Sequence, residues 1–221
     1  MIKRIFFDQD GTLRESAPGI KHCARKTLEA RKRKRIPFEK LDFIIGPPLL
    51  DCFRRCGVPE ERLNEAASLY RHFYGEEGGK YEASLYPGIL ELLKKLKEDG
   101  NHLYIATSKE AFLAKDIAKH FGFAPYFDDI FGASLDGTCA KKKDILAKGL
   151  SLTDSSLPAV RIGDTYLDRE GAKANSILGI GVDWGYGDKE KRKECGAWKI
   201  CSSGKELGDV LSDRTPSDFT E

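Results

Sequence analysis

Residues 6–12 read Phe-Phe-Asp-Gln-Asp-Gly-Thr, so that two carboxylates, Asp8 and Asp10, follow directly on an apolar run. Consecutive apolar residues such as these are typical of a strand buried on both faces of a parallel sheet. We expect Asp8 at the end of this strand, where ligands of open α/β sheets bind. Gly11 supplies backbone freedom and lets an anion approach closely. An ordinary Asp-Gly turn after a core strand is the alternative interpretation.

Apolar runs that end in a polar residue recur along the chain and predict further strands of the same sheet. Segments with helical spacing of apolar residues lie between them, and this alternation predicts an α/β fold with a Rossmann-like, doubly wound parallel sheet. The predicted strands are 2–7, 103–106, 160–163 and 177–182, and the predicted helices are 88–99, 111–120, 142–149 and 166–175.

A long interval after the first strand has helical patterns and no convincing strand. We expect an inserted helical cap domain at 16–83, within an α/β core formed by 1–15 and 84–213, and a flexible tail at 214–221. An insertion directly after a catalytic strand suits a lid or specificity domain. The helices predicted within it are 20–34, 38–43, 49–56 and 60–76.

The composition argues against several classes of partner. The chain has 221 residues, 37 positive and 35 negative side chains, and a formal net charge of +2, which does not mark it as a nucleic-acid or membrane binder. The basic run 31–35 has no interleaved aromatic residues, and we interpret it as a solvated helix end. No stretch resembles a signal peptide or a membrane span, so we expect a cytoplasmic protein. Monomer and dimer both stay open.

The six cysteines form no CxxC pair and have no zinc-ligand spacing with the four histidines. We therefore expect free thiols in a reducing compartment.

Asp8 and Asp164 both follow predicted strands and are candidates for phosphate-ester chemistry. A carboxylate such as Asp8 is ionised at neutral pH and can attack phosphorus directly, provided that its repulsion from the phosphate dianion is screened. Magnesium, held by one or two carboxylates, would screen it. Asp168 lies four residues after Asp164, so on a helix it shares that side and can bind the metal or orient its waters. Singly, Asp164 could be an N-cap and Asp168 a surface charge.

Three further positions suit the same reaction. Asp10 can protonate the leaving alkoxide and later deprotonate a water. Thr107 and Ser108 end a predicted strand and can hold phosphoryl oxygens, although Thr107 alone could equally be a helix N-cap. One lysine of 141–143 would neutralise the phosphoryl group, although lysines in such clusters usually face solvent.

Taken together, these residues resemble the haloacid dehalogenase superfamily. The stretches FFDQDGTL, IATSK, GTCAKKKDIL, and RIGDTYLDREGAK followed by GVDWGYG are similar, in that order, to its four motifs. The resemblance selects Thr107 and Lys142, and it implies a Mg²⁺-dependent phosphatase with Asp8 as nucleophile and Asp10 as acid/base. The stretches IIGPPL and LYPGILELL look most like the phosphoglycolate phosphatase and 5'-nucleotidase branch, which has a small helical cap. The sites that it implies are Asp8, Gly11, Thr107, Ser108 and Lys142 for phosphate, Asp8, Asp10, Asp164 and Asp168 for metal, and Gly46, Pro47 and Pro48 for substrate contacts from the cap.

Several features depart from the family pattern or leave alternatives open. Gln9 replaces an apolar residue, and Arg14, which we interpret as a surface residue, stands near the cap hinge. Asp10 argues for phosphate esters over dehalogenation, because a dehalogenase has no alkoxide to protonate. A phosphosugar mutase of the same superfamily and a non-catalytic polyanion-binding protein are the alternatives. The sequence does not choose among small phosphorylated metabolites as substrates.

Overall fold

A computed structural model describes residues 3–31, 36–135, 139–187 and 199–212. The chain divides into two compact units. The first, which we call the α/β unit, contains Met1–Arg14 and Leu85–Glu221, and the second, the helical unit, contains Glu15–Ser84. The predicted tail 214–221 lies outside the described residues.

The α/β unit is built on a six-stranded sheet in which every neighbouring pair is parallel. Its strand order is β5-β4-β1-β6-β7-β8, so the chain winds outward from β1 in one direction and then in the other. The predicted doubly wound α/β fold is thereby confirmed. The strands are β1 (Arg4–Phe7), β4 (His102–Glu110), β5 (Asp129–Ala133), β6 (Ala159–Gly163), β7 (Leu178–Val182) and β8 (Lys199–Cys201).

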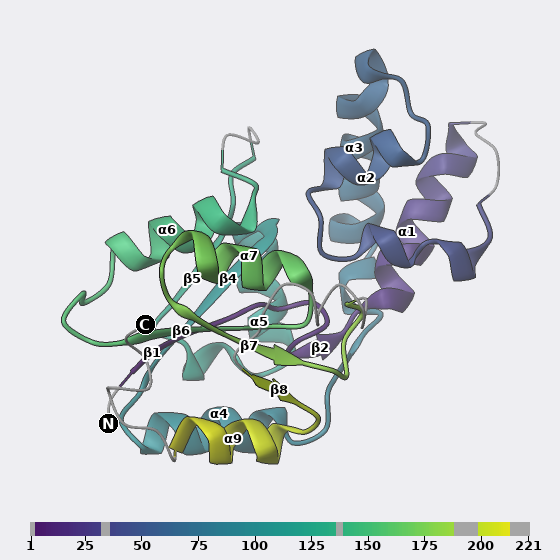
Figure 1. Cartoon of the computed structure of the whole chain (residues 1–221). Coiled ribbons are helices and arrows are strands. Elements are labelled where there is room, and N and C mark those ends of the chain that lie inside the picture. The colour runs from purple at the N-terminus through teal and green to yellow at the C-terminus, as the bar shows by residue number, and fades with distance from the viewer. Residues whose placement is uncertain (1–2, 32–35, 136–138, 188–198, 213–221) are drawn as a thin grey trace. The chain divides into compact units, whose positions relative to one another are not determined.

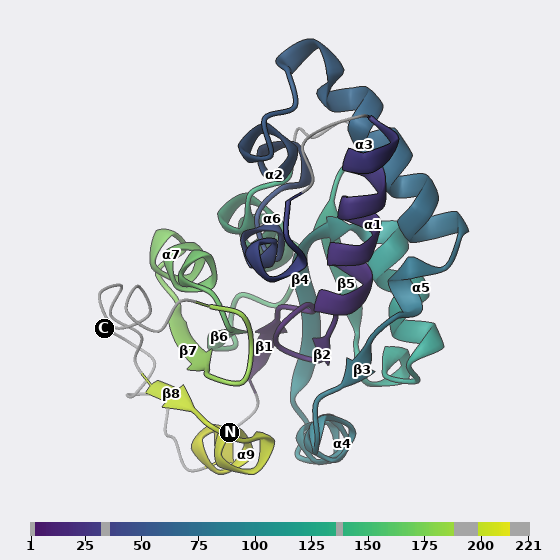
Figure 2. The same cartoon turned by 90° about the vertical axis from the view of Figure 1, so that its right-hand side faces the viewer.

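Helices cover both faces of this sheet, as Figures 1 and 2 show. On one face α6 packs against α7, and on the other α4 packs against α9. This double cover explains why the central strand has no polar alternation, because Ile5, Phe6 and Phe7 are all fully buried. The helices are α4 (Ile89–Glu98), α5 (Ala111–His120), α6 (Lys142–Ser151), α7 (Tyr166–Ala174) and α9 (Gly204–Ser212).

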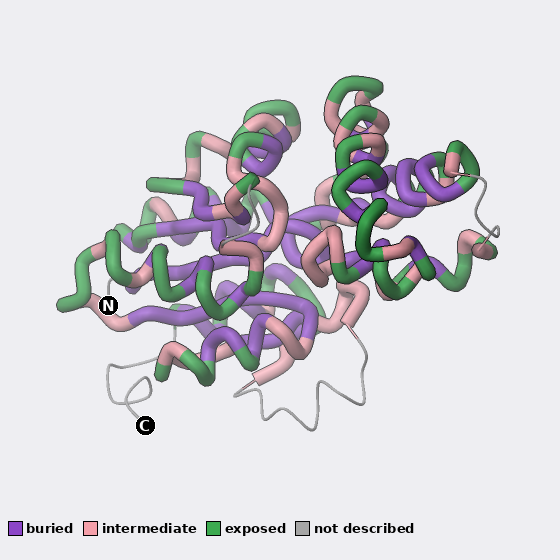
Figure 3. Tube along the Cα trace, turned by 90° about the horizontal axis from the view of Figure 1, so that it is seen from above, coloured by how far each residue is buried: buried purple, intermediate pink, exposed green. Residues whose placement is uncertain are grey.

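Helix α4 illustrates how the sequence pattern becomes packing. Ile89, Leu92, Leu93 and Leu96 are spaced so that they share one face, and all four are buried. Gly100 follows the helix with φ of 81°, a conformation in which glycine costs little. In Figure 3 buried residues follow the strands, and the helices alternate between buried and exposed positions.

The helical unit differs in detail from its prediction. The first helix begins earlier and ends at Ala30, before the basic run, of which only Arg31 is described. The segment expected to form a helix at 38–43 instead forms two short 3₁₀ turns, and the helix expected at 60–76 begins as a 3₁₀ turn and ends as a π-helix. The elements are α1 (Ala17–Ala30), η1 (Phe38–Lys40), η2 (Asp42–Ile44), α2 (Leu49–Arg55), η3 (Glu60–Arg62), α3 (Leu63–Arg71), η4 (His72–Glu76) and η5 (Gly79–Tyr81).

Some elements were not predicted from the sequence. Strands β5 and β8 and helix α9 all lie in the α/β unit, and a separate two-stranded sheet is formed by β2 (Arg14–Glu15) and β3 (Ser84–Leu85). Cysteines 23, 52, 56, 139 and 201 are thiols, and Cys195 lies outside the described residues. Among the described helices, none has both the length and the apolar character needed to cross a bilayer.

Candidate active site

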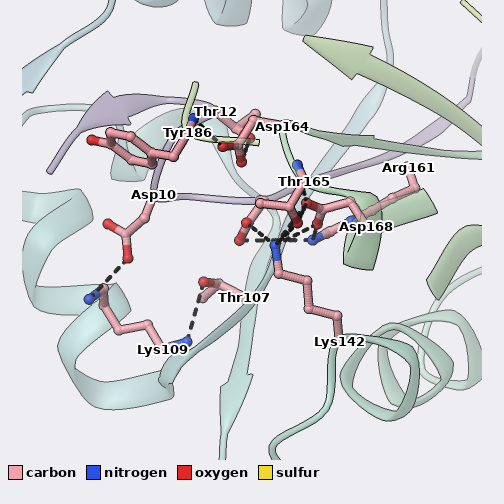
Figure 4. A network of polar contacts seen from close by, with 11 residues as sticks. Asp10, Thr12, Thr107, Lys109, Lys142, Arg161, Asp164, Thr165, Asp168 and Tyr186 are labelled. Carbon is pink, nitrogen blue, oxygen red and sulfur yellow. Dashed lines mark hydrogen bonds and ion pairs between the residues drawn. The ribbon is translucent and has the colours of Figure 1, made fainter. Parts of the chain in front are cut away.

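Three buried carboxylates meet at the carboxyl ends of neighbouring strands. Asp8 follows β1, Asp164 follows β6, and Asp168 lies in the first turn of α7. The parallel pairing of β1 with β6 places Phe7 opposite Ile162, and the Asp8 N–H donates to the Ile162 carbonyl at 2.9 Å. One oxygen from each carboxylate lies within 4.8 Å of the others. Strand register thus brings together residues that are about 160 positions apart (Figure 4).

Lys142, the first residue of α6, joins this cluster. Its ammonium donates to Asp8 Oδ2 at 2.5 Å, to the two oxygens of Asp168 at 2.8 and 2.9 Å, and to Thr165 Oγ1 at 3.2 Å. Burial alone would lower the pKa of Lys142, but Asp168 and Asp8 raise it above its ordinary value. The lysine is therefore a fixed positive charge beside Asp8.

Asp168 is held by more donors than any other carboxylate of the cluster. Besides Lys142, Arg161 Nη2 donates to its Oδ1 at 2.6 Å, and the N–H and hydroxyl of Thr165 donate to its Oδ2 at 3.1 and 2.7 Å. Burial opposes ionisation of Asp168, yet Lys142 and Arg161 outweigh it and hold its pKa below the usual range. Asp168 is thus a permanent anion that fixes the two cations.

Asp164 and Asp8 have fewer donors. Asp164 accepts the Tyr186 N–H on Oδ2 at 2.8 Å and the Thr12 hydroxyl on Oδ1 at 3.4 Å. Burial raises the pKa of Asp164 to about 7, and it also raises the pKa of Asp8 above its ordinary value in spite of Lys142. Asp8 Oδ1 is buried without a hydrogen-bond partner in the described part of the chain, and its neighbour is Arg161 Nη2 at 3.8 Å.

These features fit a magnesium ion. The cluster offers carboxylate oxygens, the ligands that magnesium prefers. One of them, Asp8 Oδ1, is buried and has no hydrogen-bond partner among the described residues. Both oxygens of Asp168 are engaged by Lys142, Arg161 and Thr165. Asp8 and Asp164 are therefore better placed than Asp168 to bind the metal directly, and a nearby divalent cation would lower their pKa values.

Asp10 lies apart from this acidic cluster. Its side chain pairs with Arg14 and Lys109, and it does not belong to the group of carboxylates that could hold a metal among the described residues. Metal binding by Asp10 stays a prediction. The interpretation of Arg14 as a surface residue is wrong, because its side chain is fully buried.

The predicted phosphate-binding residues lie around Asp8. Thr107 is buried in β4, the neighbour of β1, and Ser108 carries a buried hydroxyl oxygen that has no hydrogen-bond partner among the described residues. Gly11 has a φ of 79°, and a Cβ at this position would lie 2.3 Å from Asp164 Oδ2. Only glycine lets this turn approach the Asp164 carboxylate so closely.

Gly46, Pro47 and Pro48 lie in the helical unit, between η2 and α2. A substrate contact from this loop stays a prediction. Gln9, the unusual residue of the first motif, is buried, and its amide donates to the Ala114 carbonyl at 3.2 Å, at α5.

Sequence reasoning missed the role of Arg161. A single charge inside the otherwise apolar run Ala159–Gly163 was a usable signal, because a charge in a core strand needs a buried counter-ion. Lys109 follows Thr107 and Ser108 directly and carried no distinguishing signal. The backbone donor at Tyr186 comes from tertiary structure alone.

The chain is similar to known proteins over most of its length. Residues 5–182 match the family described as "Haloacid dehalogenase-like hydrolase". The chain is similar to a "5'-nucleotidase" of Pseudomonas aeruginosa, with 36% identity over 94% of either chain. It is also similar to a "Phosphoglycolate phosphatase" of Photobacterium profundum, with 30% identity over 84% of this chain and 85% of the relative.

The chain is also similar to two further proteins. The "Tyrosine-protein kinase PtkA" of Mycobacterium tuberculosis is 38% identical over 83% of this chain, which spans only 62% of that relative. A solved structure described as a predicted phosphatase from Clostridium acetobutylicum superposes with a TM-score of 0.90 at 34% identity, over 97% of this chain and 100% of the other. The resemblance predicted from the four motifs, and the prediction of a phosphatase-type enzyme, are confirmed.

Proposed function

The chain belongs to the haloacid dehalogenase-like hydrolase family, and we propose that it is a magnesium-dependent phosphatase of small phosphomonoesters with Asp8 as nucleophile. The observation that carries the proposal is the position of Asp8, buried at the end of the central strand with the Lys142 ammonium 2.5 Å from Oδ2. A carboxylate at this place is oriented and partly neutralised before substrate binds. Both conditions are needed for attack on a phosphate dianion.

In the first step an Asp8 oxygen forms a bond to phosphorus while the bond from phosphorus to the leaving oxygen breaks. Asp10 transfers a proton to that leaving oxygen, so the alcohol departs neutral. Lys142 stabilises the charge on the transferring group, and the Thr107 and Ser108 hydroxyls would hold its oxygens. Asp8 and Asp164 would hold magnesium, which would screen the nucleophile from the phosphate charge.

In the second step Asp10 removes a proton from a water, which attacks phosphorus and releases inorganic phosphate. The bond from Asp8 to phosphorus breaks, and the Asp8 carboxylate is regenerated. Asp168 and Arg161 keep Lys142 in place throughout both steps, because their ion pairs, at 2.8 and 2.6 Å, are buried.

We further propose that the helical unit, Glu15–Ser84, is a cap that selects the substrate. Its insertion directly after the first motif supports this, because such insertions supply binding loops. The names of the relatives point to a nucleoside monophosphate or a short phosphorylated carboxylic acid as the first substrates to try. Cytoplasmic location and activity as a monomer or dimer belong to the same proposal.

The test is phosphate release from a panel of phosphomonoesters, with and without Mg²⁺, by the wild type, Asp8→Asn and Asp209→Asn. Asp8→Asn keeps the shape of the side chain and removes the nucleophile, so we expect no turnover. Asp209 is exposed on α9, and Asp209→Asn should match the wild type. Acid-quenched wild type should carry one phosphoryl group on Asp8.

Thermal unfolding separates loss of the nucleophile from loss of the fold. Turnover by a folded Asp8→Asn variant would contradict the mechanism. If a hexose monophosphate is isomerised without phosphate release, the enzyme is a mutase. If the wild type shows no turnover, and salt-sensitive binding of a polyanion is retained in Asp8→Asn, the result would favour a non-catalytic polyanion-binding protein.

A further inference from the structure

The carboxylate of Asp10 is held between two cations that come from different parts of the α/β unit. Arg14 donates to Oδ1 from Nε at 3.0 Å and from Nη2 at 2.8 Å. Lys109 contacts Oδ2 from Nζ at 3.0 Å, as Figure 4 shows. The two oxygens of one carboxylate therefore face different partners.

Arg14 is the rigid partner of the two. Its side chain is fully buried, and its guanidinium lies 5.6 Å from the centroid of the Phe121 ring. Its carbonyl accepts the Gly11 N–H at 2.9 Å, so it is anchored in the turn that carries Asp10. A planar guanidinium with two nitrogens on one oxygen holds that oxygen in place.

Lys109 is the exchangeable partner. It offers one ammonium on a flexible stem, and its side chain is 9% exposed. Its backbone N–H donates to Thr107 Oγ1 at 3.3 Å, so the lysine emerges from the segment proposed to hold phosphoryl oxygens. An anionic substrate bound at Thr107 would compete with Asp10 for this ammonium.

We propose that Arg14 is a positioning residue that fixes Oδ1 of Asp10 and thereby assigns the proton transfers to Oδ2. This inference rests on the proposed phosphatase activity and on the role of Asp10 within it. On substrate binding Lys109 leaves Oδ2, and Oδ2 takes up a proton from solvent. This proton passes to the leaving oxygen as the bond from that oxygen to phosphorus breaks. In the second step the proton from the attacking water returns to Oδ2.

The experiment compares the first step for two classes of ester. An alkyl phosphate needs a proton on its leaving oxygen, whereas p-nitrophenyl phosphate expels a stable phenolate and does not. Rapid-quench measurements of the burst of released alcohol isolate this step from hydrolysis of the phosphoenzyme. Since a positioned acid contributes about 10²–10⁴-fold, we expect Arg14→Met to slow the alkyl burst about 10²-fold and the p-nitrophenol burst less than about 5-fold.

Three further variants make the assignment specific. In Asp10→Asn the acid is already absent, so adding Arg14→Met should slow the alkyl burst no further. Arg14→Lys keeps the charge and loses the planar fork, so it should give an intermediate alkyl burst. It also serves as the test variant if thermal unfolding shows that Arg14→Met is not folded.

Equal slowing of both bursts, or additive effects of Arg14→Met and Asp10→Asn, would overturn the inference, because Arg14 would then act on something other than Asp10. An Arg14→Met variant that matches the wild type on both esters would also overturn it. These outcomes are distinct from failure of the proposed function, in which the wild type itself releases no alcohol and forms no phosphoenzyme.

Discussion

Replacing Gly11 by alanine should disable the site with only a small loss of fold stability. The new Cβ would lie 2.3 Å from Asp164 Oδ2, whereas real Cβ contacts begin near 3.0 Å, so the carboxylate must move by about 0.7 Å. That movement strains the contacts of Asp164 with the Tyr186 N–H and the Thr12 hydroxyl. It also displaces one of the two carboxylates proposed to bind magnesium.

The backbone contributes a separate cost that can be measured on its own. Gly11 has a φ of 79°, where alanine is disfavoured by about 1–2 kcal/mol. Gly122 has a φ of 77°, and a Cβ there would have no atom of the described residues within 4 Å. Gly122→Ala therefore has the same backbone strain as Gly11→Ala and leaves the carboxylates in place.

The assay measures thermal unfolding, Mg²⁺ binding by calorimetry and phosphate release for both variants. We expect the backbone strain to lower the stability of both variants by a similar amount. Since a displacement of about 1 Å can cost about 10²-fold in rate, Gly11→Ala should lose about that factor in turnover and bind Mg²⁺ more weakly. Gly122→Ala should resemble the wild type in both. Equal turnover and equal Mg²⁺ affinity in the two variants would show that a displaced Asp164 carboxylate is not the cause of the loss.

Two other predictions concern the charges of the cluster. Lys142→Met leaves the buried Asp8 and Asp168 without their shared cation. Urea unfolding should therefore show a free energy of unfolding lower by about 3–5 kcal/mol, and phosphate release should nearly vanish. A variant as stable as the wild type would contradict this prediction. Without metal, burial raises the pKa of Asp164 in the folded protein to about 7, above its ordinary value of 3.8. The contribution of Asp164 to folding stability is therefore present below about pH 4 and is lost as the pH rises through 7. Mg²⁺ should therefore raise the unfolding temperature more at pH 8 than at pH 5 and release protons on binding at pH 6; equal shifts at both pH values would count against it.

Much of the fold could be predicted from the sequence because its signals are local. Apolar runs and helical spacing located most strands and helices of the α/β unit, and α5 has the predicted bounds. The short strands β5 and β8 carried no such pattern, and their pairing with β4 and β7 comes from the assembled sheet. In the helical unit, turns and a π-helix interrupt the spacing on which the prediction relied.

The family and the residue types of the site could be predicted from the sequence, because the four motifs follow one another in a fixed order along the chain. Only the tertiary structure decided which charges meet. Parallel pairing of β1 with β6 brings Asp8 next to Ile162. The fold buries Arg161 where it donates to Asp168, and the turn after β1 brings Arg14 into contact with Asp10. The physical reason is that a buried charge needs a partner in space, and its spacing along the chain does not specify that partner.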